Sequence, residues 1–285
     1  MKLYFAGIDI GSTMTKVAIV NEEGKICSRV IGHTGAEHRR LANQVMKEAL
    51  EPPSLSIEDI AYVVATGYGR FNVPFADRQV TELSCHAKGV TYFFPKVKTA
   101  IDIGGQDVKG LKINNGKLVD FVMNDKCAAG TGRFLEVVAD SLGLKIEDLG
   151  EISLKSQNKA TINNTCTLFA QQEIILRLSE GITLEDILAG LHDAIASRVV
   201  TMIKRLNIEP DVVLTGGVAK NIGVVKAIRE RLAREVFVPA DPLISGALGA
   251  AMLAKDFALE RLKSGEDISK KERRLEEATF FSNRE

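Results

Sequence analysis

The sequence predicts an α/β fold built from two duplicated halves, and three observations predict it. The segment DIGGQDVKGLKINNGKL at 102–118 repeats DIGSTMTKVAIVNEEGKI at 9–26, so Asp9 aligns with Asp102 and Lys16 with Lys109. Both copies alternate apolar residues with turn formers, as strand–turn–strand units require. Segments with helical spacing separate these strands. Two such units about ninety residues apart indicate a duplicated α/β core with two facing halves.

The first half is predicted to open with three strands joined by turns. Residues 2–31 contain a Gly-Ser-Thr turn and a Glu-Glu-Gly turn between alternating apolar runs. Residues 37–50 have helical spacing, and IAYVVATG at 60–67 is typical of a short buried strand that ends at glycine.

The second half is predicted to continue with a strand over 117–123 and helices after Cys127 and Cys166. Residues 187–206 predict another amphipathic helix, and 211–221 an apolar strand that runs into a double glycine and then a helix. SGALGAAMLA at 245–254 predicts a helix so rich in small residues that it packs very close to its neighbours. After Lys255 the composition becomes highly charged, which predicts a solvated helical or frayed tail.

Composition excludes several classes of function. The 285 residues carry 37 basic and 37 acidic side chains, so nothing indicates a nucleic-acid partner or a membrane surface. Apolar runs are too short for a spanning helix, and the first residues do not form a signal peptide. We therefore expect a cytoplasmic protein of one large or two medium domains. In that reducing compartment its four cysteines favour metal binding or burial over disulfides.

Three glycine turns follow apolar strands and predict a phosphate site. They are Gly11-Ser12-Thr13, Gly104-Gly105-Gln106 and Gly216-Gly217-Val218. Glycine at a strand end lets backbone N–H groups form an anion-binding nest, and Asp9 and Asp102 can hold Mg²⁺ through water. Lys16 adds a positive charge near the phosphates. One such turn alone is as often purely structural, and no Walker A motif is present, but three together favour nucleotide binding.

This pattern resembles the actin-like (ribonuclease H-like) ATPase superfamily, which includes sugar kinases and the heat-shock chaperone ATPase. The resemblance implies two duplicated domains with a nucleotide cleft between them. DIGST and DIGGQD would be the phosphate loops, TGGVAKN the adenosine loop and GALGAA a hinge helix. The expected domains are 1–95 with a returning hinge helix at 244–256, 96–243 with the cysteines, and a charged tail at 257–285. The expected ATP/ADP and Mg²⁺ contacts are Asp9, Gly11, Ser12, Thr13, Lys16, Gly104, Gly105, Gln106, Asp107, Gly216, Gly217, Val218, Lys220 and Asn221.

Cys127 and Cys166 each stand before a predicted helical run in the second half. A helix N-terminus favours a thiolate through its free N–H groups and partial positive charge. Two thiolates cannot complete a four-coordinate iron–sulfur or zinc site, but a twofold dimer doubles every ligand near its axis. We infer a Cys₄ site shared by two subunits. A lone cysteine is more often a small core residue, which is our interpretation of Cys27 and Cys85. No histidine shows ligand spacing; His33, His38 and His192 are interpreted as ordinary.

Longer motifs resemble a narrower family, the ATP-dependent activators of 2-hydroxyacyl-CoA dehydratases, which are related to the ATPase subunits of benzoyl-CoA reductases. The motifs are ATGYGR (65–70), ELSCHAKG (82–89), IDIGGQDVK (101–109), MNDKCAAGTGRFLEV (123–137), TCTLFA (165–170) and TGGVAKN (215–221). The resemblance implies a homodimer with one 4Fe–4S cluster bridged by Cys127 and Cys166 of each subunit. It also implies ATP-driven single-electron transfer from a ferredoxin or flavodoxin to an iron–sulfur dehydratase or reductase.

Catalytic roles are predicted for two residues of the second phosphate loop. Asp102 and Gln106 are the candidates for orienting Mg²⁺ and the attacking water, with Asp107 a weaker one. Two rival functions stay open at this point. One is a small-molecule kinase on the same scaffold, which has no need of the paired thiols. The other is a non-redox ATPase with a structural zinc at the dimer axis.

Overall fold

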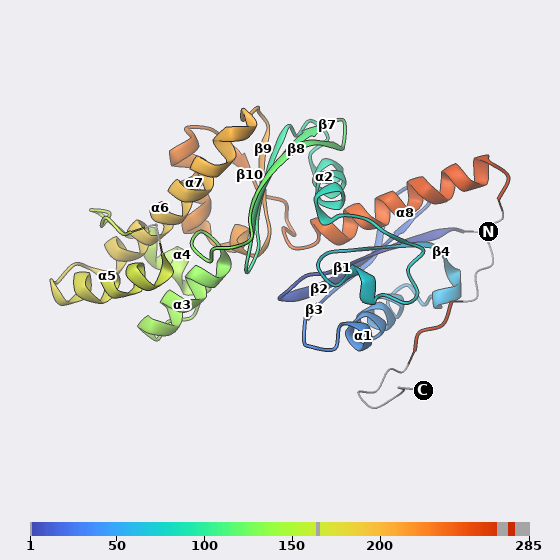
Figure 1. Cartoon of the computed structure of the whole chain (residues 1–285), viewed down its shortest axis with the longest axis horizontal. Coiled ribbons are helices and arrows are strands. Elements are labelled where there is room, and N and C mark those ends of the chain that lie inside the picture. Colours follow the sequence, from blue (N-terminus) through green and yellow to red (C-terminus); the bar gives the residue numbers. More distant parts are fainter. Residues whose placement is uncertain (1, 164–165, 267–272, 277–285) are drawn as a thin grey trace. The chain divides into compact units, whose positions relative to one another are not determined.

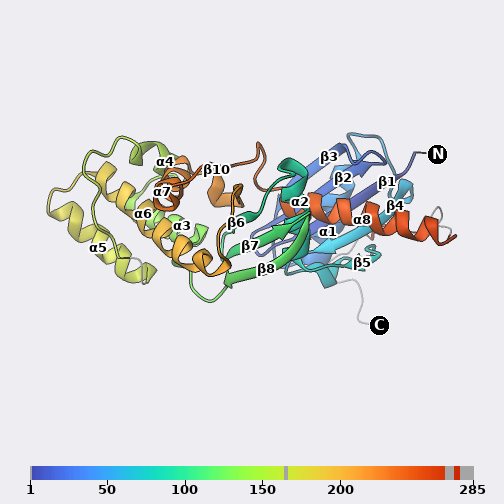
Figure 2. The ribbon, with the colours of Figure 1, turned by 90° about the horizontal axis from the view of Figure 1, so that it is seen from above.

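The computed structural model describes residues 2–163, 166–266 and 273–276, and the chain divides into two compact units. Unit 1 comprises 1–95, 115–118 and the part of the chain from 243 onward, and unit 2 comprises 96–114 and 119–242. Each unit contains one five-stranded sheet of mixed direction together with helices (Figures 1 and 2).

The sheet of unit 1 has the strand order β3-β2-β1-β4-β5. Strands β1, β2 and β3 form an antiparallel meander, as the two predicted turns require, while β4 and β5 continue the sheet in parallel. The bounds are β1 (Tyr4–Ile10), β2 (Met14–Asn21), β3 (Ile26–His33), β4 (Ile60–Thr66) and β5 (Arg78–Gln79). The helices are α1 (His38–Leu50), α2 (Glu82–Phe93) and α8 (Ser245–Lys263), with 3-10 turns at Ile57–Asp59 and Arg70–Asn72.

Successive side chains of β1 point to opposite faces of the sheet, so the core of unit 1 lies on both faces. Ala6, Ile8 and Ile10 pack on one face in a cluster that includes the apolar side of α1. Phe5 packs on the other face in a cluster that includes α8. Both faces are therefore buried, which explains why β1 and β4 are almost continuously apolar.

Helix α8 lies unusually close to its neighbours, as its Gly/Ala-rich sequence predicts. A Cβ atom at Gly7 of β1 would lie 2.1 Å from the carbonyl oxygen of Ala247. A Cβ atom at Gly249 would lie 1.7 Å from the carbonyl oxygen of Cys85 in α2. Backbone thus packs directly on backbone, and only glycine fits at these points.

The sheet of unit 2 repeats that topology with the order β10-β9-β6-β7-β8. Its strands are β6 (Thr99–Ile103), β7 (Val108–Asn114), β8 (Lys117–Asn124), β9 (Val212–Thr215) and β10 (Val236–Phe237). Its helices are α3 (Gly132–Leu142), α4 (Asp148–Ser153), α5 (Thr167–Ser179), α6 (Leu184–Ile203) and α7 (Ile222–Leu232), with 3-10 turns at Lys204–Leu206 and Gly217–Lys220. A single cluster joins the sheet to these helices through Ile101, Leu214 and Ile195.

The register of the two sheets confirms the internal repeat. Asp9 lies opposite Lys16 across β1 and β2, and Asp102 lies opposite Lys109 across β6 and β7. The parallel neighbour of Asp9 is Thr66, and that of Asp102 is Thr215. The duplication therefore extends to VVATG at 63–67 and VVLTG at 212–216, a second repeat that sequence analysis missed.

Two predictions about local structure are confirmed only in part. The helix predicted after Cys127 is present as α3, but it starts at Gly132, because a turn at Ala128–Thr131 with Gly130 at φ +95° comes first. The charged segment after Lys255 begins as a helix, as one form of the prediction had it, but part of it is buried; residues 267–272 and 277–285 of the predicted tail lie outside the described residues. Helix α8 continues to Lys263 with Ala258 fully buried, and Arg273 is buried as well.

Candidate nucleotide site and cluster cysteines

The first predicted phosphate loop is a tight turn between β1 and β2. The N–H of Gly11 donates to the carbonyl oxygen of Met14 at 3.1 Å and closes the turn. Ser12 and Thr13 at its tip are exposed. The loop therefore presents short polar side chains and backbone at the end of a buried strand, which is the arrangement that an anion-binding turn needs.

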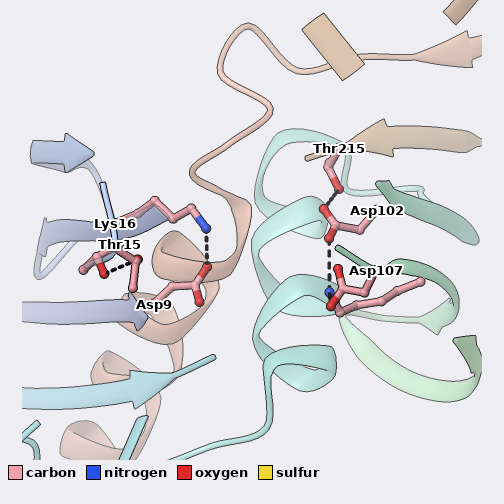
Figure 3. Close-up of polar contacts among 8 residues, drawn as sticks. Asp9, Thr15, Lys16, Asp102, Asp107 and Thr215 are labelled. Atoms are coloured by element: carbon pink, nitrogen blue, oxygen red, sulfur yellow. Dashed lines mark hydrogen bonds and ion pairs between the residues drawn. The ribbon is translucent and has the colours of Figure 1, made fainter. Parts of the chain in front are cut away.

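Asp9 lies at the base of this loop and is 4% exposed. The ammonium group of Lys16 lies 3.3 Å from its Oδ2 atom (Figure 3). Its Oδ1 atom faces the backbone of Gly67, where a Cβ would come within 2.4 Å. A carboxylate in this place, with a cation beside it, can accept hydrogen bonds from the water shell of a metal ion.

The second predicted phosphate loop has the same turn but more polar contacts. The N–H of Gly104 donates to the carbonyl oxygen of Asp107 at 2.9 Å. The hydroxyl of Thr215 donates to Oδ1 of Asp102 at 2.8 Å (Figure 3). The ammonium group of Lys109 lies 2.7 Å from Asp107 and 3.7 Å from Asp102. Asp102 is therefore fixed from two sides, by a hydroxyl and by a cation.

The two loops differ in chemistry although they share a backbone. Met14 occupies the position that Asp107 has in the second loop, as their hydrogen bonds to Gly11 and Gly104 show. The hydroxyl of Thr66 donates to the carbonyl oxygen of Val80 and not to Asp9. Only the second loop therefore combines two carboxylates, a lysine and a threonine donor. The VVxTG repeat was the sequence signal that would have identified Thr215.

The beginning of α3 is bonded to the second loop. The N–H of Gly132 donates to the carbonyl oxygen of Gly104 at 2.9 Å, and the N–H of Arg133 donates to that of Gly105 at 2.8 Å. The first N–H groups of a helix are the ones that lack a partner within the helix. Here they hold the predicted phosphate loop, so these two N–H groups are not available to a thiolate at Cys127.

The predicted adenosine loop is held by a buried hydrogen-bond chain. Asn221 caps α7 by accepting from the N–H of Val224 at 3.1 Å, so its amide nitrogen donates to Nε2 of His192 at 3.3 Å. That fixes the neutral tautomer in which Nδ1–H donates to the hydroxyl of Ser153 at 3.0 Å. Ser153 in turn donates to the carbonyl oxygen of Gly150 at 2.7 Å. Burial lowers the pKa of His192 to about 3.

The predicted cluster cysteines are the accessible thiols of unit 2. Cys166 is the N-cap residue of α5, as predicted. Cys127 comes directly before the turn that leads into α3, and its carbonyl oxygen accepts from the side-chain amide of Asn124. Both are partly exposed, whereas Cys85 is fully buried in the core, and burial raises the pKa of its thiol to about 12. Cys27 lies on a strand with its pKa also raised by burial. The interpretation of Cys85 as a core residue is confirmed.

The described residues of one chain do not complete a metal site. Among them, no group of three or more histidine, cysteine, aspartate or glutamate side chains is placed to hold a metal ion. Next to Cys166, α5 also exposes large apolar side chains, with Leu168 at 66% and Phe169 at 61%. Such a pair of thiols fits a cluster only if ligands come from a second molecule.

A profile of the BadF/BadG/BcrA/BcrD ATPase family matches residues 6–254. The chain belongs to this family. The match spans both phosphate loops, the adenosine loop and both cysteines, so the predicted ATPase character is confirmed.

Curated relatives of this BadF/BadG/BcrA/BcrD-family ATPase are similar over nearly their whole length. A 2-hydroxyisocaproyl-CoA dehydratase activator from Clostridioides difficile is 47% identical, over 93% of this chain and 100% of the relative. The (R)-2-hydroxyglutaryl-CoA dehydratase activating ATPase of Acidaminococcus fermentans is 46% identical, over 89% and 98%. One of the benzoyl-CoA reductase subunits of Thauera aromatica is more distant, at 30% identity over 87% and 91%.

Solved structures show the same fold as this family ATPase. Component A of the Acidaminococcus fermentans (R)-2-hydroxyglutaryl-CoA dehydratase superposes with a TM-score of 0.87 at 45% identity, covering 90% of this chain and 99% of that one. The Clostridium difficile 2-hydroxyisocaproyl-CoA dehydratase activator with bound ADPNP gives 0.86 at 45%, covering 93% and 98%. A ROK family glucokinase from Streptomyces griseus gives 0.54 at 16%, covering 89% and 99%, which shows the fold alone.

These likenesses confirm the predicted actin-like ATPase fold. In the described part of this family ATPase, no helix has the length and apolar character needed to cross a membrane.

Proposed function

We propose that this chain is the ATP-hydrolysing activator of a 2-hydroxyacyl-CoA dehydratase and passes single low-potential electrons to it. The observation that carries the proposal is the pairing of duplicated Asp–Lys phosphate loops with two accessible thiols on one chain. Relatives named as dehydratase activators, at 46–47% identity over nearly full length, support it. We expect the protein to act in the cytoplasm and to receive its electrons from a ferredoxin or a flavodoxin.

The two phosphate loops and the adenosine loop would together bind Mg²⁺·ATP. Asp9 and Asp102 would hold the hydrated Mg²⁺, and Lys16 would neutralise phosphate charge. Backbone and side chains of both phosphate loops would contact the phosphates, and the loop from Gly216 to Asn221 would contact the adenosine. These contacts comprise Gly11, Ser12, Thr13, Gly104, Gly105, Gln106, Asp107, Gly216, Gly217, Val218, Lys220 and Asn221.

Gln106 is the proposed water-positioning residue. It lies at the exposed tip of the second loop, within the turn that the Gly104–Asp107 hydrogen bond closes. An amide can accept from water and donate to a phosphate oxygen at the same time, which is what phosphoryl transfer to water requires. Asp102, held by Thr215 and Lys109, would direct its carboxylate toward the metal.

Cys127 and Cys166 would supply two of the four thiolates of a 4Fe–4S cluster, and a second copy of the chain would supply the other two. Their partial exposure, in contrast to that of Cys85, fits this use. The exposed apolar side chains of α5 beside Cys166 would be covered in such a homodimer. When bound, the cluster would store and release one electron at low potential.

The backbone would connect the proposed nucleotide site with the thiol of Cys127. The carbonyl groups of Gly104 and Gly105 accept from the first two residues of α3, and Cys127 comes directly before the turn that leads into this helix. A shift of the loop when the γ-phosphate leaves would therefore pull on that turn. Coupling of this kind is reciprocal, so the redox state of the thiol site would alter nucleotide affinity by the same factor. Each tenfold change corresponds to about 59 mV for one electron.

The test begins with anaerobic purification. The protein should be brown, should form a dimer and should contain about four irons per dimer. Cys166→Ser and Cys127→Ser variants should lose the iron, while the matched control Cys27→Ser, a partly buried cysteine on β3, should keep it. Colourless protein that binds zinc, or a Cys166→Ser variant that keeps its cluster, would overturn the redox assignment.

The acceptor is identified by a second assay. ATP-dependent electron transfer from reduced ferredoxin or flavodoxin should be measured against a panel of dehydratases and of benzoyl-CoA-type reductases. A benzoyl-CoA-type acceptor is the second candidate, because the 30% identical Thauera aromatica protein covers most of the chain. Equal ATP turnover in oxidised, reduced and acceptor-bound protein would contradict the proposed coupling.

A further inference from the structure

His86 of α2 lies beside the carboxylate of Asp9, although no nucleotide motif includes it. Both side chains are nearly buried, with Asp9 at 4% and His86 at 8% exposure. A Cβ atom placed on Gly246 would lie 2.7 Å from Oδ2 of Asp9 and 3.1 Å from Nε2 of His86. The two polar atoms therefore lie near the same point above the glycine, no more than about 6 Å apart, which is within reach of a direct or water-mediated hydrogen bond.

The packing of α2 on α8 holds His86 in this place. A Cβ at Gly89 would lie 1.9 Å from the carbonyl oxygen of Ser245, and one at Gly249 would lie 1.7 Å from that of Cys85. Cys85 precedes His86 directly and is fully buried. Because backbone contacts backbone on both sides of the residue, His86 has little freedom to move away from Asp9.

The two equivalent aspartates, Asp9 and Asp102, have different hydrogen-bonding neighbours. In unit 2, the hydroxyl of Thr215 donates to Asp102 at 2.8 Å. In unit 1, Thr66 has the equivalent place in the sheet, but its hydroxyl donates to the carbonyl oxygen of Val80. Lys16 at 3.3 Å is the cation beside Asp9, and Nε2 of His86 lies near the same point above Gly246 as Oδ2 of Asp9.

We propose that His86 is a positioning residue for Asp9. Its Nε2 atom orients the Asp9 carboxylate, directly or through one shared water, toward the hydrated Mg²⁺ that accompanies ATP. The assignment rests on the proposed function, since it takes Asp9 as the carboxylate that holds the magnesium.

Two substitutions distinguish the loss of the hydrogen-bond donor at His86 from the loss of its side-chain volume. His86→Leu keeps a bulky side chain but removes the donor, and His86→Gln restores an amide nitrogen at about the reach of Nε2. Nucleotide affinity should be measured by calorimetry with ADPNP, with and without MgCl₂. In the Leu variant the strengthening of binding by Mg²⁺ should fall about tenfold, with affinity in EDTA unchanged. The Gln variant should stay within about threefold of the wild-type chain.

Lys88→Ala is the matched control, because Lys88 lies on the same helix but pairs with Asp256, 2.7 Å away. It should leave the effect of Mg²⁺ unchanged. If His86→Leu does not fold, His86→Asn takes its place, since its shorter amide does not reach the Nε2 position.

The outcomes distinguish this proposal from the one on which it rests. If Mg²⁺ strengthens ADPNP binding equally in the wild-type chain and in the donor-less variant, the role of His86 is overturned and the ATPase proposal stands. If Mg²⁺ has no effect on binding in the wild-type chain, the magnesium assignment of Asp9 fails and the role of His86 fails with it.

Discussion

At the scale of single residues, the aspartates that lie near the ends of β1 and β6 show how duplicated sequences acquire different roles. Both lie opposite a lysine in the neighbouring strand. Asp102 also accepts from Thr215, whereas the equivalent Thr66 is bonded to backbone. Asp102 is therefore held by a hydroxyl as well as by a cation, and hydrogen bonds to an ionised group are among the stronger ones.

Thr215→Val should impair ATP hydrolysis because it removes the hydroxyl bond to Asp102 and keeps the shape of the side chain. A hydrogen bond to a charged group contributes about 1.5–3 kcal/mol, which corresponds to a fall in kcat of about tenfold or more. The substitution Thr66→Val, at the equivalent position of the other sheet, is the matched control. It should alter stability but leave kcat within about threefold, because the hydroxyl of Thr66 donates to the carbonyl oxygen of Val80. Equal losses in both variants would show that the Asp102 contact has no special role.

His192 should make the fold sensitive to acid. Burial lowers its pKa to about 3 in the folded chain, against about 6.5 in the unfolded chain, so the unfolded chain binds the extra proton first as the pH falls. The contribution of this histidine to stability is complete above pH 6.5. Between pH 6.5 and 3 the free energy of unfolding should fall by about 1.4 kcal/mol per pH unit from this residue alone.

Denaturant titrations of the wild-type chain and of His192→Gln, over that pH range, measure the effect. The Gln variant should be less stable at pH 7, because it perturbs the bonds to Ser153 and Asn221. It should also show a shallower dependence on pH. An unchanged slope would mean that other groups account for the acid sensitivity.

At the scale of elements, helix α8 depends on glycine at its contacts with α2 and β1. A methyl group at Gly249 would overlap the carbonyl oxygen of Cys85 at 1.7 Å, and a backbone atom cannot move aside as a flexible side chain can. The proximity of His86 to Asp9 is a product of the same packing. The small residues of this helix therefore serve the site as well as the core.

Gly249→Ala should lower the free energy of unfolding by about 3 kcal/mol or more, because α2 and α8 must separate to admit the methyl group. Gly35→Ala is the control, since a Cβ there meets nothing within 4 Å. It should change stability by no more than about 0.5 kcal/mol. Thermal or urea unfolding of the two variants gives the comparison, and equal stability would mean that the helices can part without cost.

At the scale of the whole molecule, the far C-terminal segment at 273–276 is part of unit 1 and not a free tail. Arg273 is buried, where it pairs with Asp77 and donates to the carbonyl oxygens of Ile60 and Ala61. Asp77 itself accepts from the N–H of Val63 at 2.8 Å. Leu275 packs on the core beside α1. The segment thus connects the C-terminal part of the chain to β4.

Arg273→Ala should destabilise unit 1 by about 3 kcal/mol, since it leaves Asp77 buried without its cation. The neighbouring Arg274→Ala should have little effect, because Arg274 is exposed. Both variants are tested by urea unfolding of the full chain with its cofactors bound, and the rate of ATP hydrolysis is the second measurement. ATP hydrolysis by the Arg273→Ala variant should be unchanged at temperatures where the variant stays folded. If the two variants have similar free energies of unfolding, the segment at 273–276 does not stabilise unit 1.

Sequence alone determined the duplicated α/β core, the glycine turns with their aspartates and lysines, and the interpretation of Cys85. These features follow from local rules, namely strand periodicity, turn chemistry and a visible repeat. The family also followed from continuous motifs. The site residues themselves, including Cys127, Cys166 and Gln106, stay predictions until they are tested.

Only the tertiary structure decided which groups meet across long stretches of chain. The chain from Asn221 through His192 to Ser153 and the proximity of His86 to Asp9 join residues that no spacing rule connects, and the VVxTG repeat points to Thr215 without showing that its hydroxyl donates to Asp102. The structure also moved the start of α3 from Cys127 to Gly132, where its first N–H groups hold the second phosphate loop. The physical reason is that hydrogen bonds between distant segments depend on how sheets and helices pack, whereas periodicity reports only which side of an element is buried.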